Sequence, residues 1–236
     1  MALPKISSPI FDLKIPSTKK AVKFRPFLVK EEKILLMAQQ SGDEKDITNA
    51  IMQIINNCVT SDEEFNVSRL ATFDLEYIFL KIRAKSVNNI VELSYRDTED
   101  NKLYDFKVNL DNIEITYNKK NNNKIQINDT AGIVMKFPEA RISEKLGDLT
   151  GTAAEFKIIE LCVDKIYDGD AVYRCEEMAP NELSEFIDNL DVKTFNKIKE
   201  FFDTMPKLYH KINYKNANGN DRSIELSSLK DFFTLG

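Results

Sequence analysis

The apolar residues of the N-terminal part recur at helical spacing and predict three helices. The first begins near Lys30, is rich in Glu, Lys, Leu, Met and Ala, and ends at the glycine signal Ser41-Gly42. The second has Asp46 as its expected N-cap and carries its apolar residues on one face: Ile47, Ile51, Ile54, Ile55 and Cys58. The third begins at Phe73, with one face inward and a solvated charged face outward: Leu75, Ile78, Phe79 and Ile82 against Glu76, Lys81, Arg83 and Lys85.

From Asn88 the period of the pattern changes to two, which predicts β-strands. The expected strands share an alternation of apolar and polar residues: Ile90–Tyr95, Leu103–Leu110, Ile113–Tyr117, Ile125–Ile127 and Ile133–Phe137. The polar segment Asp97–Asn101 is expected to be a hairpin loop, and the lysine and asparagine tract Lys119–Lys124 a loop tip. The middle of the chain therefore suits an antiparallel meander.

Helical spacing returns after Gly151 and dominates the C-terminal part. Three helices are expected: one that carries Phe156, Ile159 and Val163, one that starts at Pro180, and one that Asp191 caps and Met205-Pro206 ends. Between the first two, Tyr167–Asp170 predicts a hairpin turn. The Asn218-Gly219 pair predicts a terminal β-hairpin, and Ser228–Phe233 a short amphipathic helix that docks its phenylalanines onto the body.

These elements predict an α+β fold with helical N-terminal and C-terminal parts around a central antiparallel β-meander, followed by a β-hairpin and a short terminal helix. Residues 1–23 are expected to form an extended arm, 24–137 a helical segment plus the meander, and 138–236 a mainly helical segment with the hairpin. A single domain is the alternative to this division. Within the arm, Pro9–Pro16 alternates apolar and polar residues and suits a strand, which either closes the protein's own sheet or pairs with another chain.

The composition matters mainly for the functions that it disfavours. A formal net charge of −5 argues against binding to nucleic acid. Cys58, Cys162 and Cys175 form no Cys-x-x-Cys pair, so neither a zinc site nor a disulfide framework is indicated. His210 is the only histidine, which removes most histidine-based catalytic constellations. The apolar runs are too short to span a membrane and no signal peptide is visible, so we expect a cytosolic protein.

One group of carboxylates permits a different reading. Asp164, Asp168 and Asp170 lie around the predicted turn, where three carboxylates raise the alternative of calcium binding, but the twelve-residue loop and its closing glutamate are missing. A hairpin turn is the preferred interpretation. A hydrolase that uses these scattered carboxylates is the remote enzymatic alternative, and it would need them to line a pocket.

The segment that leads into the first helix carries a recognisable motif. Phe24-Arg25-Pro26-Phe27-Leu28-Val29-Lys30-Glu31-Glu32-Lys33 joins an extended stretch to the helix, because the proline favours extended backbone before it and the acidic pair suits the first helical turn. This motif resembles the opening of the T4-like bacteriophage baseplate family. Three later stretches resemble that family in the same order: Phe73–Ser86, Ile166–Asp170 and Phe201–Leu208.

The resemblance implies a function in assembly of the phage tail baseplate. We expect an assembly factor or chaperone of the baseplate hub that works by binding hub or other tail proteins in the host cytoplasm, with no catalysis, cofactor, metal or small-molecule substrate. A permanent subunit of the virion baseplate is the alternative, and a homo-oligomer is left open. Many members are expected to carry a Cys-x-x-Cys staple in the terminal hairpin, but Lys215–Gly219 lacks cysteine here, so no metal role is carried over.

The phenylalanine excess supports a function in binding. The two helices from Pro180 to Met205 are the most aromatic stretch of the chain, and any part of them that one small core does not bury would form an exposed apolar patch. The residues expected to contact a partner are aromatic or belong to the motif: Phe24, Arg25, Pro26, Phe27, Phe201, Phe202, Phe232 and Phe233. Packing in the protein's own core is the competing interpretation of the same residues.

Overall fold

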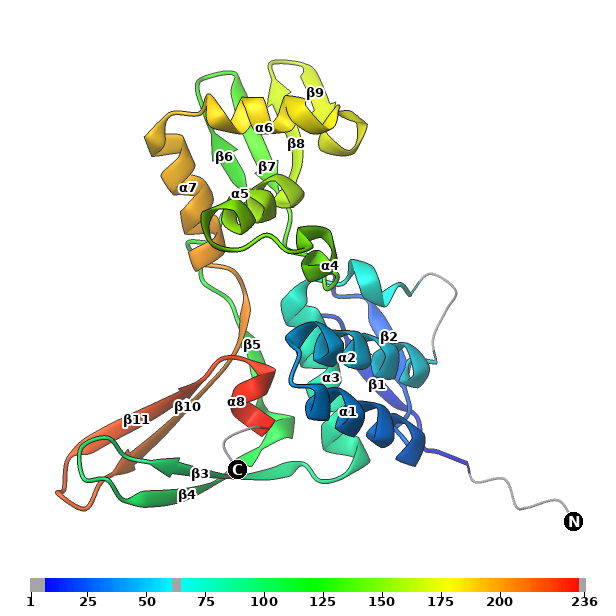
Figure 1. Cartoon of the computed structure of the whole chain (residues 1–236), viewed down its shortest axis with the longest axis vertical. Coiled ribbons are helices and arrows are strands. Elements are labelled where there is room, and N and C mark those ends of the chain that lie inside the picture. The colour runs from blue at the N-terminus through cyan, green and yellow to red at the C-terminus, as the bar shows by residue number, and fades with distance from the viewer. Residues whose placement is uncertain (1–6, 61–64, 234–236) are drawn as a thin grey trace, which may run out of the picture. The chain divides into compact units, whose positions relative to one another are not determined.

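The computed structural model describes residues 7–60 and 65–233 (Figure 1). The chain divides into two compact units, of which unit 1 contains the residues up to Thr116 and from Lys207 onward, and unit 2 runs from Tyr117 to Pro206. Both units combine helices with antiparallel strands, so the predicted α+β class is confirmed. The boundary expected at Pro138 falls inside unit 2.

Unit 1 begins with a β-hairpin instead of an extended arm. Strand β1 (Phe11–Lys14) pairs antiparallel with β2 (Ala21–Phe24), so the alternating stretch closes the protein's own two-stranded sheet. The turn between the two strands is hydrogen-bonded to the third helix. Both the N–H and the hydroxyl of Ser17 donate to the carboxylate of the buried Asp74 in that helix. Residues 1–6 of the predicted arm lie outside the described residues.

Three helices follow the hairpin: α1 (Val29–Ser41), α2 (Glu44–Cys58) and α3 (Thr72–Ser86), with a short 3-10 turn η1 (Val67–Arg69) before α3. The glycine stop is confirmed, because Gly42 ends α1 in the left-handed region with φ of 70°. The N-cap prediction for α2 is wrong. Asp43, and not Asp46, accepts a hydrogen bond from the N–H of Lys45 at 2.7 Å, so the helix starts three residues earlier.

Helix α3 lies at the centre of unit 1 and is apolar almost all round, with ten of its residues buried. The prediction of a solvated charged face is wrong at Lys81, which is buried and directs its ammonium group at main-chain oxygens. Lys85 remains exposed and pairs with Asp111 at 2.8 Å, as a surface charge does. Burial of the helix at Lys81 is therefore compensated by internal partners for its charge.

The strands expected to form one meander are divided among separate sheets. In unit 1, β3 (Ile90–Arg96) pairs only with β4 (Leu103–Asn109), and the turn η2 (Leu110–Asn112) leads to β5 (Glu114–Thr116). Strand β5 pairs with β10 (Lys207–Lys215), which pairs with β11 (Asp221–Leu226) ahead of the terminal helix α8 (Leu229–Phe233). In a meander β5 would pair with the next strand in the sequence, but here it pairs with β10, which comes from the C-terminal part of the chain.

The tips of the two long hairpins of unit 1 are joined by a polar network instead of a metal staple. Asp97, at the β3–β4 turn, accepts hydrogen bonds from the Tyr214 hydroxyl and from Nε of Arg222 at 3.1 Å. Glu99 in the same turn accepts one from the Asn218 amide at 3.3 Å, across to the β10–β11 turn. These hydrogen bonds connect two turns that the sequence predicts separately as hairpin loops, without indicating that they meet.

Unit 2 packs helices on one side of a four-stranded sheet. The antiparallel strands follow the order β6 (Lys124–Gln126), β7 (Ala131–Met135), β8 (Val163–Asp168) and β9 (Ala171–Arg174). The helical segments are α4 (Ile142–Leu146), α5 (Gly151–Cys162), the turn η3 (Cys175–Glu177), α6 (Pro180–Asp188) and α7 (Val192–Asp203). The predicted turn at Gly169 and the N-cap Asp191 are confirmed.

The core of unit 2 joins the sheet to its helices. Ile125, Ile133 and Ile166, which lie side by side on neighbouring strands, pack with Ile159 of α5 and Phe201 of α7. The ring of Phe201 stacks on Phe137 with centroids 5.5 Å apart. Among the residues that the structure describes, no helix has the length and apolar character needed to cross a membrane.

Candidate functional site

The family motif forms a buried ion pair at the start of α1. Nη2 of Arg25 lies 3.0 Å from Oε1 of Glu31, whose side chain is fully buried. The other oxygen of Glu31 accepts the N–H of Leu28 at 2.8 Å and so satisfies one of the free donors at the helix N-terminus. Burial raises the pKa of Glu31, but the hydrogen bonds from Arg25 and Leu28 outweigh it and hold the pKa below its ordinary value.

The same motif is tied to the ends of α2 and α3. The N–H of Arg25 donates to the carbonyl of Cys58 at 2.9 Å, and the N–H of Phe27 donates to the hydroxyl of Ser86 at 2.9 Å. The Cys58 thiol lies 3.7 Å from the Arg25 guanidinium, and burial raises its pKa to about 11, so it stays protonated at neutral pH. These contacts fix the direction in which α1 leaves the motif.

Helix α1 presents an apolar face to solvent. Its buried side chains are Glu31 and Ala38, whereas Val29, Leu36 and Met37 are 73%, 49% and 71% exposed. Val29 and Leu36, seven residues apart, share one side of the helix, and Met37 lies about 100° from Leu36 with the exposed Lys33 and Gln40 between them. We call the surface that carries these three apolar side chains the α1 face. Large apolar side chains gathered on a supported helix are typical of a protein-binding surface.

The sequence reasoning missed the α1 face. The run Leu35-Leu36-Met37 carried the signal, because three consecutive residues of a helix cannot all face the same core. The sequence pattern identifies the adjacent motif, but it predicts that the aromatic residues of the motif contact a partner and that the residues of the helix pack in the core.

The residues predicted to contact a partner lie in both units. Four of these side chains are buried in the structure: Phe24, Phe27, Phe201 and Phe232. Arg25, Pro26 and Phe202 are partly buried, and Phe233 belongs to α8 with a side chain outside the description. Phe201 and Phe202 are part of unit 2 and the others part of unit 1. A partner role for the eight residues stays a prediction, and the buried four have a packing role in this conformation.

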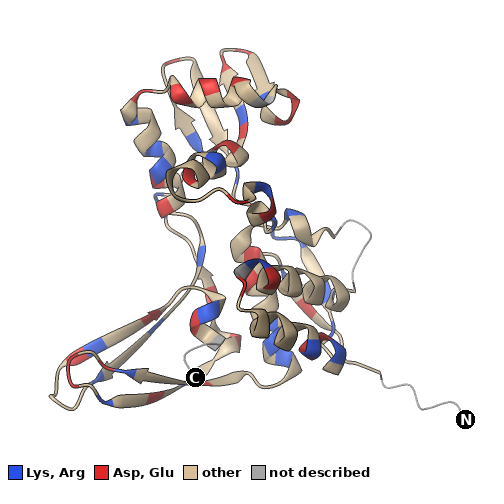
Figure 2. Ribbon diagram, in the orientation of Figure 1, with Lys and Arg blue, Asp and Glu red and all other residues tan. Residues whose placement is uncertain are grey.

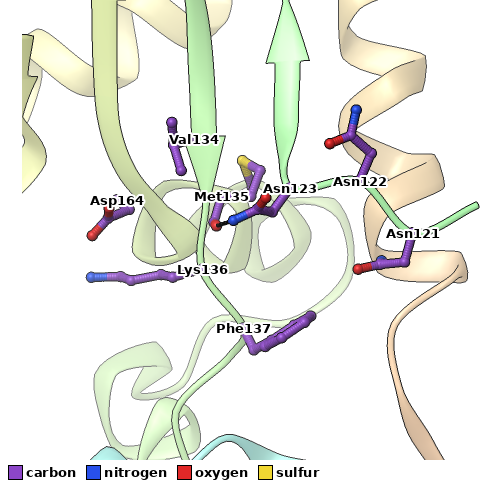
Figure 3. Close-up of a pocket in the computed structure, with 8 residues that line it drawn as sticks. All are labelled: Asn121, Asn122, Asn123, Val134, Met135, Lys136, Phe137 and Asp164. Carbon is purple, nitrogen blue, oxygen red and sulfur yellow. Dashed lines mark hydrogen bonds between the residues drawn. The ribbon is translucent and has the colours of Figure 1, made fainter. Parts of the chain in front are cut away.

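Unit 2 contains an open pocket of about 500 Å³ at the ends of β7 and β8 (Figure 3). Its lining combines amides, apolar side chains and two charged groups: Asn121, Asn122, Asn123, Val134, Met135, Lys136, Phe137 and Asp164. The amide of Asn121 is engaged by the Phe201 carbonyl and the Thr204 hydroxyl at 2.9 and 3.1 Å. Lys136 and Asp164 are the charged groups that remain for a ligand.

The carboxylates considered for calcium or hydrolysis are spread along one hairpin. Asp164 lines the pocket, whereas Asp168 accepts a hydrogen bond from Thr130 at 2.8 Å beside the β8–β9 turn. Four residues along a strand separate these two by about 13 Å. Within residues 7–60 and 65–233, no cluster of three or more His, Cys, Asp or Glu side chains has the arrangement of a metal site.

The comparison with known families agrees with the motif. No curated protein and no solved structure matches the chain. The family described as T4 bacteriophage base plate protein matches residues 8–234, a range that includes the motif, α1, the β1–β2, β3–β4 and β10–β11 hairpins of unit 1 and all of unit 2. The chain therefore belongs to the T4 bacteriophage base plate protein family.

Proposed function

We propose that this protein is an assembly factor of the baseplate hub that acts by binding other tail proteins, without catalysis, in the host cytoplasm. Family membership supports the class of partner, since a baseplate protein works among other phage tail proteins. The observation that carries the proposal is the α1 face, where Val29, Leu36 and Met37 are exposed on a helix anchored by a buried ion pair.

The physical reason lies in the cost of apolar exposure. Covering such side chains is favourable by about 25 cal/mol for each Å² of apolar surface removed from water. The supported start of α1 also reduces the ordering cost of binding, because the helix is already held by Arg25, Glu31 and Ser86. A transient partner would use this surface during assembly and release it afterwards.

A permanent subunit of the virion baseplate is the second candidate. The family description supports it directly, since the family is named for the base plate itself. Both candidates use the same surface, and they differ in whether the partner ever leaves.

The decisive experiment is recovery of the tagged protein from infected cells during tail assembly, together with its copy number in finished virions. Co-purified hub proteins with no virion copies support the assembly factor, and stoichiometric virion copies support the subunit. Absence of any baseplate partner would contradict both.

A pair of variants connects the result to the surface. Leu36→Asp with Met37→Asp should abolish recovery of the partners and leave the fold intact. Val192→Asp, a change at a comparably exposed apolar residue of unit 2, is the matched control and should retain them. Equal recovery with both variants would exclude the α1 face as the binding surface.

A further inference from the structure

Strand β9 is an open edge of the unit 2 sheet. Among the residues that the structure describes, the sheet order β6-β7-β8-β9 leaves one side of β9 without a neighbouring strand (Figure 1). All four of its residues are exposed, including the apolar Val172 at 58% and Tyr173 at 52%. Natural edge strands are commonly shielded by lysine, proline or a covering segment, and an exposed apolar edge is a template for another strand.

The turn geometry determines which backbone groups face outward. Asp168 pairs with Ala171 across a two-residue loop, in which Gly169 has a φ of 57°, as the first position of a type II′ turn requires. The pair that flanks such a loop is hydrogen-bonded, and the direction alternates along the strand. Val172 and Arg174 therefore direct their N–H and C=O groups away from β8, toward the open side.

The two faces of the sheet differ in chemistry. Tyr173 lies in register with Ile166 and Ile133, on the face that packs against the helices. The opposite face carries a basic row, in which Arg174 lies beside Lys165 and Lys165 beside Val134, with Lys124 beyond. Figure 2 shows Lys and Arg along the strands of this sheet.

Beside the basic row, cationic side chains outnumber the carboxylates, which are those of Asp164 and Glu176. Like charges directly opposite each other on neighbouring strands are destabilising, and Lys165 faces Arg174 in this way. Neither residue, nor Lys124, forms an ion pair among the residues with described positions. An acidic side chain from outside would relieve this repulsion, although the chain as a whole has a net charge of −5.

We propose that β9 receives an extended acidic segment of a partner protein as a fifth strand of the sheet. The segment has an apolar residue opposite Tyr173 and an acidic residue opposite Arg174. Main-chain hydrogen bonds to Val172 and Arg174 supply affinity, and the charge pair with Arg174 selects the acidic sequence. This surface is separate from the α1 face and adds a second class of contact to the proposed function.

A protein segment fits this edge better than a nucleic acid does. Asp164 and Glu176 line the same shallow depression as Lys136, Lys165 and Arg174, so the excess of one positive charge there attracts a carboxylate and a phosphate alike, and the backbone groups of β9 make the difference. The outward N–H and C=O groups of β9 alternate as donors and acceptors, which matches a polypeptide strand.

The test uses the purified full chain and a dye-labelled peptide of about eight residues that alternates valine and glutamate. Fluorescence anisotropy measures affinity, and amide NMR shifts locate binding. We expect shifts at residues 171–174 and no binding of the peptide in which lysine replaces glutamate. Arg174→Glu should raise the dissociation constant for the acidic peptide by about tenfold or more. Val172→Pro, which removes an outward N–H, should abolish binding.

Two control variants separate the possible outcomes. Lys193→Glu makes the same charge change at an exposed residue of α7 and should bind as the wild type does. The double α1 variant should also bind the peptide normally, so failure of the proposed function and failure of this inference are distinguishable. Unchanged binding by Arg174→Glu and Val172→Pro, no binding by the wild type, or preferential binding of a single-stranded RNA at residues 171–174 would overturn the proposal.

Discussion

The ammonium group of Lys81 lies 2.7 Å from the main-chain oxygen of Ile113, although 32 positions separate the two residues. The same group contacts the carbonyl oxygens of Leu110 and Asp111 at 3.3 and 2.8 Å and the carboxylate of Glu114 at 3.3 Å. Burial lowers the pKa of Lys81, and the neighbouring Glu114 opposes that effect. One lysine of α3 therefore satisfies the backbone that leads into β5.

Replacement of Lys81 by methionine should destabilise unit 1, because three carbonyl groups lose their donor. An unsatisfied buried polar group costs about 1–3 kcal/mol, so we expect the free energy of unfolding to fall by about 3 kcal/mol. Urea denaturation measures it. Lys107→Met is the matched control, since Lys107 pairs with Glu92 on the surface, and should change stability by less than about 0.5 kcal/mol. Equal losses in both variants would contradict the role of Lys81.

The Arg25–Glu31 pair should be sensitive to loss of either partner. Glu31→Leu leaves the partly buried guanidinium without its carboxylate, and we expect a loss of about 3 kcal/mol in denaturant unfolding. Adding Arg25→Met to that variant should recover part of the loss, because no uncompensated charge remains. If the double variant lost more unfolding free energy than the two single variants lose together, the pairing would be contradicted.

The same pair should make stability depend on pH in the acidic range. The folded state holds the pKa of Glu31 below the unfolded value, so its contribution is present above that value and is lost as the pH falls through the folded pKa. Denaturation of the wild type and of Glu31→Gln between about pH 6 and pH 3 tests this, and the wild type should lose more stability. Parallel curves would contradict it.

Glu76 should act in the opposite direction and near neutral pH. Burial raises its pKa to about 7, with a hydrogen bond from the Leu229 N–H opposing and the charge of Asp231 adding to the shift. The folded state therefore keeps a proton that the unfolded chain releases near pH 4.5, and stability should decline as the pH rises from about 5 to about 8. Glu76→Gln should flatten this decline, measured by urea unfolding across the range.

His210 also contributes to the pH dependence of stability, and its contribution is the same in the wild type and in Glu76→Gln. Burial lowers its pKa, so its own contribution is lost as the pH falls through its unfolded value, opposite in sign to Glu76. It is present in both proteins and cancels in their difference. Identical slopes for the wild type and Glu76→Gln would show that Glu76 ionises normally in the folded state.

Tyr214 should control the ionisation of Asp97. The hydrogen bond from its hydroxyl is the largest contribution that lowers the pKa of Asp97 to about 2, supported by the turn N–H groups and Arg222. Tyr214→Phe should raise that pKa toward the ordinary aspartate range, as carboxyl NMR titration would report. Tyr209→Phe, which removes a hydroxyl elsewhere on β10, should leave it unchanged. A low pKa in Tyr214→Phe would assign the effect to the other donors.

The sequence by itself determined the local elements and the family. The stop at Gly42, the cap at Asp191 and the turn at Asn218-Gly219 were predictable because each depends on a few neighbouring residues and their backbone preferences. The motif that begins at Phe24, together with the stretches Phe73–Ser86, Ile166–Asp170 and Phe201–Leu208, indicated the family for the same reason, since each stretch is contiguous.

Only the tertiary structure decided which segments meet. Alternation predicts a strand but not its partner, so the pairing of β5 with β10 was not visible. Lys81 was predicted to be exposed to solvent, because helical spacing shows which residues share one face of a helix but not which other elements cover that face. The same limit hid the exposure of Met37 and Val172. Burial is decided by contacts between residues far apart in the chain, and local periodicity carries no record of them.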